Sequence, residues 1–349
     1  MRQYLLPPEG RFYKANLHCH SSVSDAGLSP RELKEAYKAK GYSVLAITDH
    51  EWMVPHPELN DPDFLTITAY EMTVRDGTKT TPDNRIVHMN LYAKDPSCTR
   101  HICFDPKAAK AYCRLKAEEV EREELGETAD HVYTPEFINR VTREAKENGF
   151  LVSFNHPDWG LEMPADYLTY DGFFTVEVYN HSCFMDVGLA EENLNVYDAM
   201  LRSGKRLYCT CNDDNHNRKG LDPDFTDSFG GFNMIKAPEL TYEAVMRALE
   251  NGDFYASCGP EIHEMYVEDG YLHIRCSPVR DILLGTSGRK GAHVRARAGE
   301  TVTEAVFELK DYYQYFRVTL IDREGYKAFS HAWFRDQIRP EALNKISNI

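Results

Sequence analysis

The sequence predicts an α/β protein with a mostly parallel, buried sheet, followed by a small β domain. Two observations favour this fold. In the first part of the chain an amphipathic helical segment is repeatedly followed by a short apolar strand, which is the order typical of parallel sheets. From Gly259-Pro260 onward, short strands separated by turns replace this order. We therefore expect an α/β domain over residues 1–258 and a β-rich domain over residues 259–349, and 349 residues with 42% hydrophobic content can bury both cores.

The helix-then-strand order is marked by helix caps. Ser29-Pro30-Arg31-Glu32 forms a capping box with proline at the first helical position, and Gly41 ends that helix. The apolar run SVLAIT that follows is predicted to be a buried strand. The same order predicts these helices and strands: helices near 134–149, 189–203 and 242–250, and strands at 12–17, 43–48, 64–68, 86–92, 150–155, 173–179 and 206–211.

The C-terminal part is predicted to be β-rich. A strand is expected at 254–256 and another at 316–321, with a turn at 322–325 leading into a strand at 326–333. The acidic segment 116–127, by contrast, is expected to be a solvent-exposed helix face.

Composition excludes several classes of protein. Forty Lys and Arg against fifty-five Asp and Glu give a net charge of −15, which opposes passive binding to a nucleic acid polymer or an anionic membrane. The longest apolar runs are strand-sized, and the first residues contain no hydrophobic signal segment, so we expect a cytoplasmic protein without membrane association. Nine cysteines without a repeated C-x-x-C indicate neither a disulfide framework nor a zinc ribbon.

Polar side chains lie at or just beyond the ends of the predicted strands. Six strands deliver a His, Asp or Glu there, and a seventh carries His88. The carboxyl ends of parallel strands meet on one face, so these side chains are expected to lie close together. The candidate ligands are His18, His20, Asp25, His50, Glu71, His88, His156, Asp214 and His216.

A cluster of imidazoles and carboxylates predicts a metal centre. Such groups would repel one another or lie unpaired unless a cation compensated them. A mixed nitrogen and oxygen set favours Zn, Mn or Fe over Mg or Ca. The number of ligands is sufficient for two or three divalent ions.

The motifs together resemble those of the polymerase-and-histidinol-phosphatase (PHP) superfamily of metal-dependent phosphoesterases. HCHSSVSDAG, TDHE, the isolated Glu71, His88, NHP and DNH occur in the family's order between Arg11 and about Gly259. The segment from Phe254 and the later hairpin with Trp333 look like the extra domain of the carbaryl-hydrolase-like branch. The resemblance implies a distorted seven-stranded (β/α) barrel with a β-sandwich-like domain after it.

The resemblance also implies how the ligands are divided among three ions. One ion would take His18, His20, Glu71 and Asp214, a second would share Glu71 and take His88 and His156, and a third would lie between Asp25, His50 and His216. The chain departs from the family at two places. It has Asn212-Asp213 where Gly-Ser is frequent, and Ser24-Asp25-Ala26-Gly27 where Asp-Gly is usual.

Three further residues are candidates for catalytic or supporting roles. His181 follows a strand that should point into the same site and is a candidate proton donor or phosphate contact, although an exposed loop histidine fits equally well. Glu177 is a candidate for the site or for hydrogen bonding to its ligands. Asp49 is expected to orient an imidazole.

The activity expected from this site is hydrolysis of a small phosphate mono- or diester by a metal-bound hydroxide. Two alternatives use the same centre: a carbamate or carboxylic ester hydrolase, and a non-catalytic binding module that metal stabilises. A nucleic-acid exonuclease is disfavoured by the acidic net charge.

Overall fold

The structure is a computed structural model that describes residues 1–77, 84–112, 128–188 and 193–344. The helices are α1 (Pro30–Ala39), α2 (Pro106–Tyr112), α3 (Pro135–Glu147), α4 (Pro164–Tyr167), α5 (His181–Val187), α6 (Leu194–Arg202), α7 (Tyr242–Asn251) and α8 (Pro340–Leu343), with short 3₁₀ turns at η1 (Pro57–Leu59) and η2 (Arg335–Gln337). The predicted solvent-exposed helix face at 116–127 lies outside the described residues. None of the helices in the described ranges is long and apolar enough to cross a bilayer.

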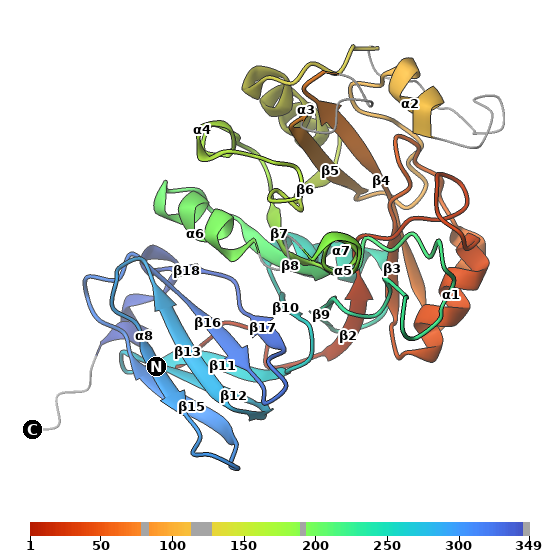
Figure 1. Ribbon diagram of the computed structural model, residues 1–349. Coiled ribbons are helices and arrows are strands. Elements are labelled where there is room, and N and C mark those ends of the chain that lie inside the picture. Colours follow the sequence, from red (N-terminus) through yellow and green to blue (C-terminus); the bar gives the residue numbers. More distant parts are fainter. Residues whose placement is uncertain (78–83, 113–127, 189–192, 345–349) are drawn as a thin grey trace, which may run out of the picture.

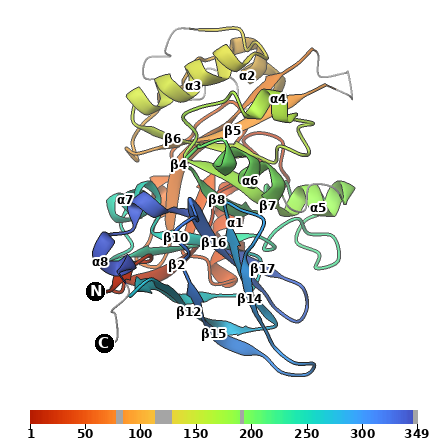
Figure 2. The same cartoon turned by 90° about the vertical axis from the view of Figure 1, so that its left-hand side faces the viewer.

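The strands form one large mixed sheet and one smaller sheet. They are β1 (Gln3–Tyr4), β2 (Arg11–Asn16), β3 (Val44–Ile47), β4 (Leu65–Arg75), β5 (Ile86–Ala93), β6 (Phe150–Asn155), β7 (Thr175–Asn180), β8 (Tyr208–Asn212), β9 (Phe232–Ala237), β10 (Phe254–Ser257), β11 (Ile262–Glu268), β12 (Tyr271–Val279), β13 (Asp281–Thr286), β14 (Ala292–Arg295), β15 (Val302–Glu308), β16 (Tyr315–Ile321), β17 (Lys327–Phe329) and β18 (Trp333–Phe334). The large sheet has the order β14-β13-β16-β17-β10-β9-β2-β3-β4-β5-β6-β7-β8, with β18 beside β16. Figures 1 and 2 show α3 beside strands β4–β6 and the strands from β11 to β16 at the other end of the molecule.

The prediction of a mostly parallel sheet is wrong. β2, β3 and β4 are parallel neighbours, as are β6, β7 and β8, but β5 runs antiparallel between β4 and β6, and β9 runs antiparallel to β2. Strands buried on both faces are apolar whatever their direction, so their composition does not reveal the direction of β5.

Backbone pairing does not close the sheet into a barrel in the part of the chain that the structure describes, where β8 pairs only with β7. Side-chain amides bridge the gap to the neighbouring strands instead. The side chain of Asn233 in β9 accepts from the backbone N–H of Cys211 at 3.2 Å and donates to its carbonyl at 2.9 Å. Asn212 Oδ1 accepts from the backbone N–H of Leu17 at 3.2 Å. Two buried asparagines thus link β8 to β9 and to the end of β2.

The helices cover the sheet with their apolar faces. Ser29 and Thr134 cap α1 and α3 as predicted, with their side chains accepting from the N–H groups of Glu32 and Phe137. α3 packs on β6, α7 on β9 and α1 on β3. The predicted helix at 189–203 is confirmed as α6, although residues 189–192 lie outside the described residues. Elements not predicted from the sequence include α2, α4, α5, α8, β1 and β9.

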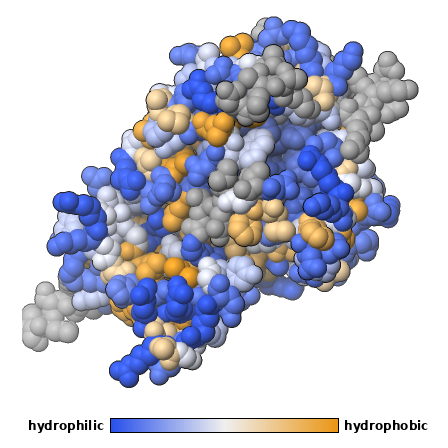
Figure 3. Space-filling view, viewed as in Figure 1, coloured by the Kyte–Doolittle hydropathy of each residue, from blue (hydrophilic) through white to orange (hydrophobic). Residues whose placement is uncertain are grey.

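The C-terminal part is continuous with the large sheet. β10 pairs with β9 on one side and with β17 on the other, and β17 joins it to β16 and β13. The smaller sheet, β1-β11-β12-β15, packs against these strands around a core that includes Ile262, Leu272, Ile282 and Leu320. Hydrophilic side chains cover most of the outer face seen in Figure 3, and hydrophobic ones occur in separate groups.

Candidate metal centre

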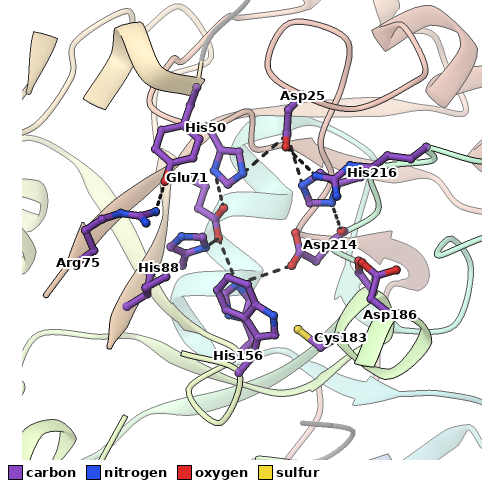
Figure 4. A pocket seen from close by; sticks show the side chains of 15 residues that line it. Asp25, His50, Glu71, Arg75, His88, His156, Cys183, Asp186, Asp214 and His216 are labelled. Carbon is purple, nitrogen blue, oxygen red and sulfur yellow. Dashed lines mark hydrogen bonds and ion pairs between the residues drawn. The ribbon is translucent and has the colours of Figure 1, made fainter. Parts of the chain in front are cut away.

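Nine histidine and carboxylate side chains from different segments converge at one place. They come from the segments that follow β2, β3, β6 and β8, and from within β4 and β5. All nine residues proposed from the sequence are among them: His18, His20, Asp25, His50, Glu71, His88, His156, Asp214 and His216. Figure 4 shows the side chains of seven of them pointing toward a common cavity: Asp25, His50, Glu71, His88, His156, Asp214 and His216.

Glu71 lies at the centre of this cluster. Its Oε1 is 3.1 Å from His18 Nε2 and 3.2 Å from His88 Nδ1, and its Oε2 is 3.0 Å from His50 Nδ1. The sequence placed Glu71 beyond the end of a strand at 64–68. It lies inside β4 instead, because that strand continues to Arg75 through its antiparallel pairing with β5.

His88 reaches the site because β5 runs antiparallel to β4. It is the third residue of β5 and pairs with Thr73, so the beginning of β5 lies beside the end of β4. β5 therefore contributes a residue from near its beginning to the face where the parallel strands contribute residues at or beyond their carboxyl ends.

Asp214 is the second carboxylate shared within the cluster. Its Oδ1 lies 3.0 Å from His18 Nε2 and 2.9 Å from His20 Nε2, and its Oδ2 lies 3.6 Å from His156 Nε2. Asp214 and His156 have positive φ angles of 54° and 26°, which are uncommon for residues other than glycine. Such backbone conformations persist where the surroundings impose them, which is frequent at functional sites.

The ligand-type atoms form four overlapping groups, and the atoms of each group lie within 4.8 Å of one another. The groups are His18, His20, Glu71 and Asp214; Glu71, His88 and His156; His20, Asp25, His50 and His216; and His18, His156 and Glu177. The first two contain the residues that the family resemblance implies for the first and second ions. The third contains those implied for the third ion, together with His20.

Several atoms in this cluster are buried and make no hydrogen bond. They include Glu71 Oε2, Asp214 Oδ1 and His156 Nε2. Glu71 Oε2 lies 3.0 Å from His50 Nδ1 and Asp214 Oδ1 lies 2.9 Å from His20 Nε2, but neither oxygen accepts a hydrogen bond there. Leaving a buried carboxylate oxygen without a hydrogen bond is costly. A divalent cation would compensate both oxygens and accept the imidazole nitrogen as a ligand, so the residues fit a metal centre.

The protonation states of His20, His88 and Glu71 also suit cation binding. Burial lowers the pKa of His20 to about 4, so its imidazole is neutral at pH 7, and burial does the same for His88. Burial alone would raise the pKa of Glu71, but the imidazoles of His88 and His18 hold it well below its usual range. Neutral imidazoles and ionised carboxylates are the forms that bind metals.

Glu177 lies behind the cluster, where it holds two of the histidines. Its Oε1 lies 3.0 Å from His18 Nδ1 and accepts from Asn212 at 2.9 Å. Its Oε2 accepts from the backbone N–H of His156 at 3.0 Å and from Asn180 at 2.8 Å. Of the two roles foreseen for Glu177, the contacts favour hydrogen bonding to the ligands.

Asp49 forms no hydrogen bond to an imidazole among the described residues. Its carboxylate accepts from the backbone N–H and the hydroxyl of Ser21 at 2.8 and 2.6 Å, and from those of Ser24 at 3.2 and 2.6 Å. Asp49 therefore fixes the loop between His20 and Asp25, and so the positions of two candidate ligands.

His181 is the first residue of α5. Its Nδ1 lies 2.8 Å from the hydroxyl of Tyr179, and its ring packs closely against Gly230. It is not among the residues that line the cavity at the cluster.

That cavity has a volume of about 360 Å³. Eight of its lining residues are not among the site residues predicted from the sequence: Arg75, Ile86, Tyr112, Trp159, Ser182, Cys183, Asp186 and Arg218. Trp159 lies beside the cluster, with its ring 4.9 Å from that of His156. The two-residue period of a strand could have identified Arg75, because residues 71, 73 and 75 share one face of β4. No comparable pattern in the sequence marks Tyr112, Trp159 or Asp186.

Comparison with known proteins gives a short sequence match and several distant structural ones. No family model matches the chain. A 5′-3′ exoribonuclease of Haemophilus influenzae is 53% identical over 38 residues, which is 11% of this chain and 14% of that protein, so the match spans about a seventh of the length of this curated relative.

Among solved structures, a two-domain protein from Bacteroides vulgatus, described as containing a predicted PHP-like metal-dependent phosphoesterase, matches 94% of this chain and 98% of its own, with 14% identity and a TM-score of 0.40. A putative metal-dependent phosphoesterase from Bifidobacterium adolescentis matches 64% of this chain and 94% of its own, with 16% identity and a TM-score of 0.36. An amidohydrolase from Chromobacterium violaceum matches 58% of this chain and 87% of its own, with 15% identity and a TM-score of 0.34.

Proposed function

We propose that the chain is a metal-dependent hydrolase of the PHP superfamily that acts on a small phosphate ester. The observation that carries the proposal is the overlap of the ligand groups around Glu71. A single structural cation needs about four ligands, whereas nine candidate ligands here fall into groups that share Glu71, His18, His20 and His156. Shared ligands are what two or three neighbouring cations require.

The first cation would be held by His18, His20, Glu71 and Asp214, the second by Glu71, His88 and His156, and the third by Asp25, His50 and His216. The mixed nitrogen and oxygen ligands suit Zn, Mn or Fe. When bound, such cations lower the pKa of water toward neutrality and polarise a phosphoryl or carbonyl oxygen.

The residues around the cluster support a small anionic substrate. A cavity of about 360 Å³ is the size of a small-molecule site. Its wall includes Arg75, whose guanidinium is cationic at neutral pH. A nucleic acid polymer stays disfavoured because the net charge is −15.

The experiment combines metal analysis with a panel of esters. Purified protein is analysed for metals and tested on 4-nitrophenyl phosphate, bis(4-nitrophenyl) phosphate, 4-nitrophenyl acetate and an aryl N-methylcarbamate. We expect at least two metal equivalents per chain, with the phosphate esters cleaved fastest. Asp214→Ala and His20→Ala should lose metal and turnover, while His263→Ala, an exposed histidine of β11, should keep both.

Three results would contradict the proposal. If Asp214→Ala still turned over substrate after a chelator was added, the activity would not depend on the assigned metal centre. Faster cleavage of the carbamate or the acetate would favour the alternative hydrolase. Metal binding that raises Tm without turnover of any ester would favour a binding module.

A further inference from the structure

One face of β4 leads from the metal centre to the outer part of the cavity. Residues 71, 73 and 75 lie on this face because side chains alternate along a strand. Glu71 belongs to the cluster, the hydroxyl of Thr73 lies 3.2 Å from His88 Nε2, and Arg75 lines the cavity. Figure 4 shows Arg75 on the opposite side of the cluster from Asp186.

Arg75 has no acidic partner among the described residues. Its guanidinium donates a hydrogen bond to the neutral hydroxyl of Tyr112. Arg218, the other arginine of this cavity, lies 2.9 Å from Asp25, and Arg85 lies 2.9 Å from Asp166. A guanidinium stays protonated and carries five N–H donors, so Arg75 offers the cavity a positive charge and donors that no carboxylate of the described chain occupies.

Arg75 belongs to none of the ligand groups around Glu71. Four residues of strand correspond to about 13 Å between the backbone positions of Glu71 and Arg75. An anion bound to Arg75 would lie in the same cavity as the metal centre, because the ring of Tyr112, the hydrogen-bond partner of Arg75, is 5.0 Å from that of His50.

We infer that the substrate carries a carboxylate in addition to its scissile ester, and that Arg75, held by Tyr112, binds this carboxylate. The inference rests on the proposed function and adds a substrate class to it. A planar guanidinium matches a carboxylate with two parallel hydrogen bonds, and one positive charge balances one negative charge. Asp186 on the opposite side of the cluster would repel the same group, so the charges favour one orientation of the substrate.

Binding of uncleavable analogues tests this inference without turnover. Metal-loaded protein is titrated by calorimetry with ω-phosphonoalkanoates of two to six carbons and with alkylphosphonates of the same lengths, whose C–P bond a phosphoesterase does not cleave. We expect the carboxylated compound to bind about tenfold tighter or better at the best length, the effect expected of a charge-assisted hydrogen bond. Arg75→Met should remove this gain, and Arg75→Lys should keep part of it. Arg247→Met, which changes an exposed arginine of α7 paired with Glu243, should leave it intact.

The outcomes separate this inference from the proposed function. Equal affinity for carboxylated and plain phosphonates at every length would overturn the inference and leave the phosphoesterase proposal standing. Retention of the gain in Arg75→Met would overturn it as well. Plain alkylphosphonates should bind Arg75→Met as they bind the unchanged chain, which shows that the metal centre is intact. Failure of the metal-loaded protein to bind any phosphonate would overturn the proposed function and the inference together.

Discussion

Replacing Glu177 with Gln tests whether this buried carboxylate positions the candidate ligands. Each of its oxygens has two partners, His18 Nδ1 and Asn212 on Oε1, and the backbone N–H of His156 and Asn180 on Oε2. The amide nitrogen of Gln cannot accept a hydrogen bond, so two of the four contacts are lost whichever way the amide turns. Hydrogen bonds to a charged group contribute about 1.5–3 kcal/mol each. We therefore expect the free energy of unfolding of the metal-free chain to fall by about 3 kcal/mol.

Metal affinity should fall at the same time. Partners that orient a metal-binding histidine typically account for about 10–100-fold in affinity, which corresponds to about 1.4–2.7 kcal/mol. Urea unfolding of the metal-free chain gives the stability, and competition with a chromophoric chelator gives the metal affinity. Glu162→Gln is the matched control, because Glu162 is also buried and accepts two tyrosine hydroxyls but lies outside the ligand groups. Unchanged metal affinity in Glu177→Gln would refute the positioning role.

Three further predictions concern stability. Arg317 of β16 is buried and forms two hydrogen bonds of 2.9 and 2.8 Å to Asp198 of α6. Asp198→Ala should therefore lower the free energy of unfolding, measured in urea, by about 3 kcal/mol. A decrease below about 1 kcal/mol would contradict this. Burial lowers the pKa of His331 to about 3, so its contribution to stability is complete above its unfolded pKa of about 6.5 and is lost as the pH falls toward 3. Between pH 8 and 5.5 the free energy of unfolding of the unchanged chain should fall by about 1.4 kcal/mol more than that of His331→Gln. Parallel pH profiles of the two proteins would exclude this. Removal of metal by a chelator should lower Tm, and added Zn or Mn should restore it, whereas Asp214→Ala should show no such response. At a free metal concentration one hundred times Kd, metal binding should raise the free energy of unfolding by about 2.7 kcal/mol.

Local sequence signals predicted α1, α3, α6, α7 and most strands of the first part of the chain, because caps and apolar periodicity act within a few residues. Ser29 and Thr134 fix the beginnings of α1 and α3 through their own hydrogen bonds. The direction of β5 depends instead on pairing between distant segments, which its apolar sequence does not encode. β9 was missed although Phe232–Ala237 is apolar at its first, third and fourth positions, because no cap or turn pattern was recognised around it.

The candidate ligands were found even where the strand boundaries were wrong. The prediction for Glu71 required only that its strand run toward the face where the other ligands lie. β4 does so, although it continues past Glu71 to Arg75. The roles of the surrounding residues were harder to predict. Asp49 stabilises a serine loop and Glu177 holds His18 from behind, and both depend on which segments pack together in three dimensions. Tyr112 and Trp159 come from segments whose course the sequence does not determine.

The pairing of β10 with β17 has a consequence for shortening the protein. Cleavage after Ser257 would expose the backbone donors and acceptors of β10 along a free edge, which is a template for aggregation. It would also remove Tyr315 and Phe329 from the apolar core that lies under the ligand-bearing strands. The ligand-bearing half is therefore expected to be produced in soluble, folded form only together with the strands that follow it.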